Sequence, residues 1–198
     1  MFLSDRIWRA IERGAEWHGE QKRRVSGLPY FVHPYAVGFL LAHFTDSEDV
    51  VIAGLLHDVL EDVKGMTPDT IEVEFGKEVT RLVKEVTEDR SIRVTGFHLT
   101  RSSRWRAIKE EYLRRLADDS EGALMIAAAD KICNIRSFLD DYPKYGDDFW
   151  KTYGRSKAEY IWSVEEQNKV IQEKLKHPLA TELDQMTKAV LETIGISS

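Results

Sequence analysis

The chain has 198 residues, of which 42% are hydrophobic and 31% charged, and its formal net charge is −6. This length predicts one compact domain, at about 150 residues per domain, and excludes a tandem enzyme. The ordinary composition, with only 12 glycines and 5 prolines, excludes fibrous and largely disordered proteins. The negative charge gives no overall case for binding nucleic acid, so an anionic ligand needs a local basic patch.

Apolar residues recur at helical spacing along most of the chain, and strand-like alternation is scarce, so we predict an all-α fold. The first helix is expected over about Asp5 to Glu20. A second should run from about Pro34 to Phe44, because a proline fits the first helical turn, and His33 then lies close to its N-cap. Thr67-Pro68-Asp69 predicts another helix start, since it combines a capping residue, a first-turn proline and an acid that complements the helix dipole.

Gly76 separates that helix from one expected over Lys77 to Val86. Further helices are predicted over Ala123 to Leu139, Lys157 to Leu175 and Thr181 to Ile194. The sequence contains no internal repeat, low-complexity tract or linker. We therefore predict a single domain over residues 1–198, with a core at about 5–175 and a C-terminal helix at about 181–194.

A local basic patch is present between Arg90 and Arg115, a stretch that contains eight basic residues and only two acidic ones. One interpretation is a solvated loop followed by the outer face of a helix. The other, of about equal weight, is recognition of phosphate groups. The basic residues are Arg90, Arg93, Arg101, Arg104, Arg106, Lys109, Arg114 and Arg115.

The most informative motif is His57-Asp58 followed by Glu61-Asp62. At about 100° per residue these side chains fall within an arc of roughly 140° on one helix, opposite an apolar face. Three neighbouring carboxylates repel one another unless a cation or shared protons intervene, which favours a divalent metal ion. Taken alone, the motif also fits an amphipathic helix with an acidic outer face.

Two further residues strengthen the metal hypothesis. His33 lies at a helix start upstream, and Asp130 interrupts the apolar run Ile126 to Ala129. An aspartate in so apolar a helix is costly to bury unless a cation pairs with it. Asn134, four residues later, shares its face. Each alone fits a cap or a salt bridge, but together they favour a metal site.

This set resembles the HD-domain metal-dependent phosphohydrolases, whose ligands are a separate His, an adjacent His-Asp pair and a distant Asp. Those positions are His33, His57-Asp58 and Asp130 here. Within that family the sequence resembles the hydrolase domain of RelA/SpoT-type alarmone enzymes and the stand-alone small alarmone hydrolases. The matching strings are Ser26-Gly27-Leu28-Pro29-Tyr30, His33-Pro34, His57 to Asp62, Phe75-Gly76, Val86-Thr87 and Ala129 to Arg136, within roughly two-thirds of the chain.

The resemblance implies a compact helical HD-domain fold that binds one divalent ion, typically Mn²⁺, and removes pyrophosphate from the 3′ position of guanosine tetra- or pentaphosphate. The mixed nitrogen and oxygen ligands also suit Fe²⁺ or Zn²⁺. The ion would polarise the 3′ phosphate and lower the pKa of a bound water. Glu61 and Asp62 would orient that water and handle its proton, and which of the two is the base stays open.

By the same resemblance, substrate contacts are expected at Arg23, Arg24, Ser26 and Asn134. Val25 separates the arginine pair from the serine, so the choice between the two arginines stays open.

A tyrosine in a later helix is expected to line the pocket, and Tyr160 is the candidate, although a core or surface aromatic residue is an equal alternative. Cys133 is expected to be a small core residue rather than a nucleophile, because no motif pairs it with a base.

Two alternatives remain open at this stage. One is a phosphohydrolase acting on another phosphorylated nucleotide, for example on the 2′-phosphate of NADPH. The other is a non-catalytic nucleotide sensor, which the retention of Glu61 and Asp62 disfavours. The length leaves no room for a synthetase domain, so alarmone synthesis is not expected.

The location is expected to be cytoplasmic. The first ten residues carry Asp5, Arg6 and Arg9 and no apolar signal-peptide core. No apolar run approaches the ~18 residues that a membrane span needs, and a single cysteine cannot form an internal disulfide.

Overall fold

The computed structural model describes residues 3–91 and 100–195, and within these residues it is helical without a β-sheet. A single antiparallel bridge joins Lys22 to Pro29. The all-α prediction is therefore confirmed. The helices are α1 (Asp5–His18), α2 (Val32–Phe44), α3 (Glu48–Leu56), α4 (Val59–Asp62), α5 (Pro68–Phe75), α6 (Lys77–Val86), α7 (Arg101–Leu116), α8 (Glu121–Tyr145), α9 (Asp148–Tyr153), α10 (Lys157–Lys174) and α11 (Pro178–Thr193).

Most predicted helix starts are where the sequence signals placed them. The side chain of Thr67 caps α5 by accepting from the Thr70 backbone N–H, and Pro68 is the first helical residue. Gly76 then separates α5 from α6 with a φ of 88°, a backbone conformation that favours glycine. His33 is the second residue of α2, so its place at a helix start is also confirmed.

The prediction of one helix through His57-Asp58 and Glu61-Asp62 is wrong. α3 ends at Leu56 and α4 begins at Val59. Asp58, with φ −90° and ψ −8°, departs from helical geometry, and its carbonyl accepts from the backbone N–H groups of both Glu61 and Asp62. The motif therefore occupies a break between two helices, which changes the relative direction of its two halves.

The second half of the chain contains more helix than the periodicity predicted. Within the basic stretch, for which a loop followed by a helix was one interpretation, α7 runs from Arg101 to Leu116 with Thr100 as its cap. α8 does not end near Leu139 but continues to Tyr145 through Pro143, a residue that normally interrupts helices. The short helix α9 was not predicted, because six residues are too few for a periodic signal.

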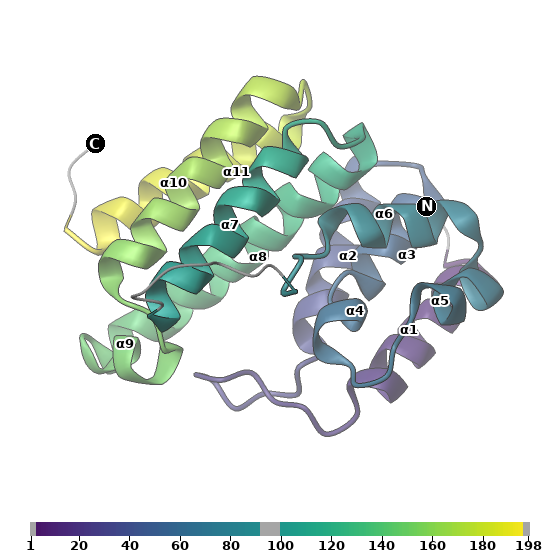
Figure 1. Ribbon diagram of the computed structural model, residues 1–198, viewed down its shortest axis with the longest axis horizontal. Coiled ribbons are helices and arrows are strands. Elements are labelled where there is room, and N and C mark those ends of the chain that lie inside the picture. Colours follow the sequence, from purple (N-terminus) through teal and green to yellow (C-terminus); the bar gives the residue numbers. More distant parts are fainter. Residues whose placement is uncertain (1–2, 92–99, 196–198) are drawn as a thin grey trace.

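α8 lies at the centre of the molecule (Figure 1). It packs against α2, α3 and α6 on one side and against α10 and α11 on the other, while α7 lies against α6 and α10. Its segment Ala123 to Ala129 is buried, which places the following residue, Asp130, beside α2. In the described part of the chain, no helix is long and apolar enough to cross a membrane.

Candidate active site

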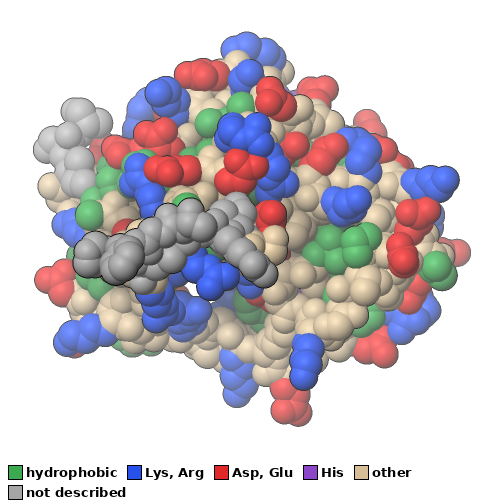
Figure 2. Space-filling view, viewed as in Figure 1, with side chains coloured by type: hydrophobic (Ala, Val, Ile, Leu, Met, Phe, Trp, Pro, Cys, Tyr) green, Lys and Arg blue, Asp and Glu red, His purple; other side chains and the backbone are tan. Residues whose placement is uncertain are grey.

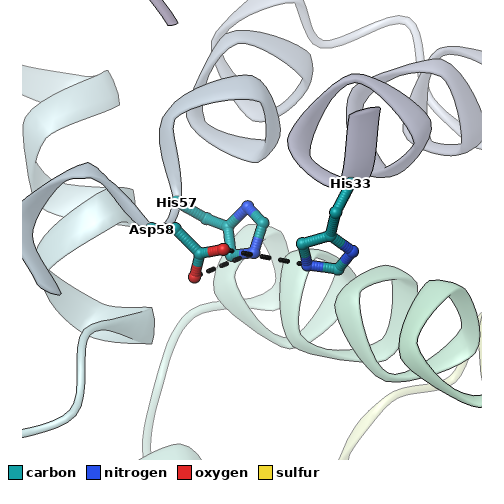
Figure 3. A group of neighbouring side chains, drawn as sticks. All are labelled: His33, His57 and Asp58. Atoms are coloured by element: carbon teal, nitrogen blue, oxygen red, sulfur yellow. Dashed lines mark ion pairs between the residues drawn. The ribbon is translucent and has the colours of Figure 1, made fainter. Parts of the chain in front are cut away.

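Two histidines and an aspartate from separate parts of the chain meet inside the molecule. His33 comes from α2, and His57-Asp58 forms the break between α3 and α4. Each offers one nitrogen or oxygen atom, and these atoms lie within 4.8 Å of one another. In Figure 3 the Asp58 carboxylate points toward both rings, with Oδ1 3.2 Å from His57 Nε2 and Oδ2 3.8 Å from His33 Nε2.

Asp130 joins this cluster from α8. Its Oδ1 lies 2.9 Å from His33 Nε2 and 3.5 Å from His57 Nε2. The structure thus brings together all four residues predicted as metal ligands.

The orientation of His57 fits a cation at the centre of the cluster. Its Nδ1 lies 2.8 Å from the carbonyl oxygen of Gly54, which can only accept, so Nδ1 carries a proton and donates. The other nitrogen, Nε2, is buried and has no hydrogen-bond partner among the described residues. Metal-binding histidines are usually held in this way, with one ring nitrogen fixed by a backbone carbonyl and the other left free to ligate the metal.

The charges of the cluster also favour a cation. Burial alone lowers the pKa of His57, but the Asp58 and Asp130 carboxylates raise this pKa to about 10. Burial alone raises the pKa of Asp130, yet the neighbouring His33 and His57 imidazoles bring this pKa well below its ordinary value. The Asp58 and Asp130 carboxylates therefore favour a positive charge at the centre of the cluster, which a divalent ion would supply.

The predicted acid pair lies beside the cluster on α4. Glu61 is mostly buried, with 12% of its side chain exposed. Burial raises its pKa to about 7, with further contributions from the negative charges of Glu88 and Asp58. Glu61 is thus ready to exchange a proton near neutral pH, as a general acid or base requires.

Tyr30 is a site residue to which the sequence analysis gave no role. Its hydroxyl lies 2.8 Å from Oδ2 of Asp58 and 2.8 Å from Oδ2 of Asp62. It therefore links a predicted metal ligand to one of the predicted catalytic acids. The available signal was its place in the string Ser26 to Tyr30, three residues before His33.

The cluster opens onto a cavity of about 1290 Å³. The cavity is lined by residues 23–26 and Tyr30, by α4, α7 and α8, and by residues from the aromatic C-terminal half. All eleven predicted site residues line it: Arg23, Arg24, Ser26, His33, His57, Asp58, Glu61, Asp62, Asp130, Asn134 and Tyr160. Their proposed roles remain predictions.

The two predicted arginines differ in their contacts. Arg23 donates to Asn134 Oδ1 at 3.2 Å, and the Asn134 amide donates to Asp130 Oδ1 at 2.7 Å. Arg23 is therefore connected to the end of the cavity that holds the histidine and aspartate cluster, here called the metal end. Arg24 donates to the backbone carbonyl of Tyr153 at 2.6 Å. Ser26 lines the wall nearby.

Tyr160 fits both interpretations offered by the sequence. It lines the cavity, but it is 7% exposed and stacks on Phe138 with ring centroids 4.7 Å apart, as a core aromatic residue does. Its hydroxyl has no partner among the described residues. Cys133 is partly buried, and burial raises the pKa of its thiol to about 12, which disfavours a nucleophile.

The basic residues of this stretch differ in their partners. Arg93 lies outside the described residues. Arg106, Arg114, Arg90 and Lys109 pair with acids of this protein. Arg101 and Arg104 line the cavity and have no carboxylate partner in the part of the chain that the structure covers.

Of these two, Arg101 lies near two further arginines of the cavity wall, Arg24 and Arg155. Burial lowers the pKa of Arg155, and the positive charges of Arg101 and Arg24 lower this pKa further. Such crowding of like charges favours an anionic ligand. In Figure 2, Lys and Arg side chains gather at the lower left, over the region where α7 begins in Figure 1.

Comparison with known proteins agrees with the site. The HD domain family matches residues 10–148. The human guanosine-3′,5′-bis(diphosphate) 3′-pyrophosphohydrolase MESH1 is 31% identical over 172 residues, which cover 85% of this chain and 89% of the human protein. A probable guanosine-3′,5′-bis(diphosphate) 3′-pyrophosphohydrolase of Mycoplasma pneumoniae is 36% identical over 132 residues, and this match spans 18% of that longer protein.

A solved structure of similar fold belongs to a protein described by the same activity. It is described as a metazoan ortholog of SpoT that hydrolyzes ppGpp, and it superposes with a TM-score of 0.75 at 26% identity over 99% of both chains. The family match covers well over half of this chain, and the human relative is matched along most of its length. The chain therefore belongs to the HD domain family, in the group that includes these pyrophosphohydrolases.

Proposed function

We propose that this protein is a metal-dependent 3′-pyrophosphohydrolase of guanosine tetra- and pentaphosphate, which releases pyrophosphate and leaves GDP or GTP. The observation that carries the proposal is the content of one cavity. It combines a histidine and aspartate cluster suited to a divalent ion, an acid pair and arginines without carboxylate partners in the described residues. The names of the relatives at 31% and 36% identity support the same reaction.

The metal would be held by His33, His57, Asp58 and Asp130. We propose Mn²⁺ first, and Fe²⁺ or Zn²⁺ as alternatives, because the ligands are nitrogen and oxygen atoms with no thiolate. When bound, such an ion supplies Lewis acidity toward phosphate oxygens.

The protein side chains supply the proton chemistry. Glu61 and Asp62 orient the attacking water and accept its proton, and the raised pKa of Glu61, about 7, allows that exchange near neutral pH. The water oxygen forms a bond to the phosphorus attached to the ribose 3′ oxygen. The bond between that phosphorus and the 3′ oxygen breaks, and the 3′ oxygen takes up a proton.

The arginines balance the charge of the substrate. A guanosine tetraphosphate carries several negative charges, and the metal cluster and acid pair are themselves acidic, so one divalent ion cannot neutralise everything. Arg23 lies at the metal end of the cavity, and Arg24, Arg101 and Arg155 lie near one another elsewhere on its wall. We infer that Arg23 and Arg24 bind the phosphate groups, while Arg101 and Arg155 attract the anionic substrate to the cavity from a longer distance.

Turnover of guanosine tetraphosphate by Mn²⁺-loaded protein tests the function, with the products identified by chromatography. GDP and pyrophosphate are expected in equal amounts. Glu61→Gln and Asp62→Asn should each keep the metal and lower turnover about 100-fold or more, as expected for loss of a proton-handling group. An intact tetraphosphate, together with release of phosphate from another nucleotide such as NADPH, would overturn the assignment.

A further inference from the structure

The guanidinium of Arg90 contacts both members of the acid pair. Its Nη2 donates to Oε2 of Glu61 at 2.7 Å, and its Nη1 lies 3.3 Å from Oδ1 of Asp62. Nη1 also donates to the backbone carbonyl of Glu61 at 3.1 Å. A planar guanidinium that makes three contacts fixes the two carboxylates relative to each other and to the backbone of α4.

Each carboxylate is also held from its other side. Oε1 of Glu61 accepts the backbone N–H of Glu88 at 2.7 Å, and Oδ2 of Asp62 lies 2.8 Å from the Tyr30 hydroxyl. Among the described residues, Arg90 is the only basic side chain that pairs with either acid. Removing it would free one oxygen of Glu61 and one of Asp62.

The segment that carries Arg90 is itself held by the basic helix α7. Arg115 donates to the carbonyl of Thr87 at 2.8 Å, Lys109 pairs with the Glu88 side chain, and Arg104 donates to the carbonyl of Arg90 at 3.0 Å. Much of the basic stretch is therefore used to hold residues 87–90 against α4. This use of positive charge is distinct from binding an anionic ligand.

We propose that Arg90 is a positioning residue, which holds Glu61 and Asp62 in the orientation needed for proton transfer without binding the substrate itself. The inference rests on the proposed function. Two carboxylates already neutralise its guanidinium, whereas Arg101 and Arg155, on the same cavity, have no carboxylate partner among the described residues. Exposed ion pairs contribute little, but this one includes Glu61, whose side chain is 12% exposed.

The test compares Arg90→Met, Arg90→Lys and a control, Arg114→Met, which makes the same change of charge at an exposed pair outside the cavity. Arg90→Met should lower kcat about 10- to 100-fold, with KM within about threefold and the Mn²⁺ content unchanged. Arg90→Lys should recover part of kcat, because it restores the charge but not the fork that spans two carboxylates. Arg114→Met should match the original protein.

Two readouts separate positioning from other roles. The acid limb of the kcat profile should move to higher pH in Arg90→Met, because Glu61 loses a neighbouring positive charge. A raised KM with unchanged kcat would instead make Arg90 a substrate contact, and unchanged kcat, KM and pH profile would make it a surface ion pair. Either result overturns the proposal.

A measurement without turnover keeps the two proposals apart. In metal-free protein, the ¹³C carboxyl resonance of Glu61 should titrate at higher pH in Arg90→Met than in Arg114→Met. If the original protein leaves guanosine tetraphosphate intact, the proposed function fails, and this titration still decides whether Arg90 controls Glu61. Identical titrations in the two variants would overturn the role of Arg90.

Discussion

The carbonyl of Gly54 accepts a hydrogen bond from Nδ1 of His57 at 2.8 Å, at a place where α3 packs closely on α2. A Cβ atom on Gly54 would lie 2.3 Å from Cδ1 of Leu41 and 3.5 Å from Cγ1 of Val37. The missing side chain therefore allows the close approach of the helix that carries His33 to the segment that carries His57.

Gly54→Ala should separate these two helices. The clash in a buried interface should lower the free energy of unfolding by about 1–3 kcal/mol, partly offset by about 1 kcal/mol from the better helix propensity of alanine. The shift of His57 should also weaken metal affinity. Urea unfolding and competition with a chelator measure the two effects, and unchanged values for both would mean that Leu41 moves away freely.

Loss of a predicted ligand should release the metal. His57→Ala or Asp58→Ala should remove the ion and abolish hydrolysis, because the remaining carboxylates then lack a complete site. Metal analysis of protein purified without chelator checks this. Asp140→Ala, at an exposed position on α8, is the matched control and should keep its metal. Full occupancy in Asp58→Ala would contradict the ligand assignment.

The buried Glu61 predicts a pH dependence of stability. Its pKa is about 7 in the folded protein, raised by burial and by Glu88 and Asp58, and ordinarily 4.5. Between these pH values the folded protein holds a proton that the unfolded chain has lost, so the free energy of unfolding falls as pH rises. Glu61→Gln should remove this loss in chelator-treated protein.

Urea unfolding at about pH 5 and about pH 8 measures this effect of Glu61 on the free energy of unfolding. The difference in free energy of unfolding, Glu61→Gln minus the original protein, should become more positive from about pH 5 to about pH 8. Glu173→Gln, at an exposed position, should show no such change. The same difference at both pH values would mean that Glu61 does not take up a proton on folding.

The arginines of the cavity predict how substrate affinity changes. Arg23→Ala combined with Arg24→Ala should raise KM for guanosine tetraphosphate about tenfold or more, because two phosphate contacts are lost. Arg101→Glu should have a smaller effect that weakens with added salt, as expected for long-range attraction. Steady-state kinetics at low and high ionic strength check both, and an unchanged KM in the double variant would exclude these arginines from substrate binding.

The sequence by itself was sufficient for the all-α class, for most helix starts and for many of the residues that meet at the site. Local signals determine these features, because capping residues such as Thr67 and helix-breaking glycines such as Gly76 act on their own segments. A polar residue in an apolar run, such as Asp130, is likewise visible because burying it without a partner is costly.

Tertiary structure alone decided the relations between segments. The break at His57-Asp58, the hydroxyl of Tyr30 between two aspartates and the contact of Arg90 with Glu61 depend on packing among α2, α4 and the end of α6. Composition could not separate the basic residues that hold residues 87–90 from those that face the cavity. Their roles depend on which charge lies within a few ångströms, and residues distant in sequence supply that charge.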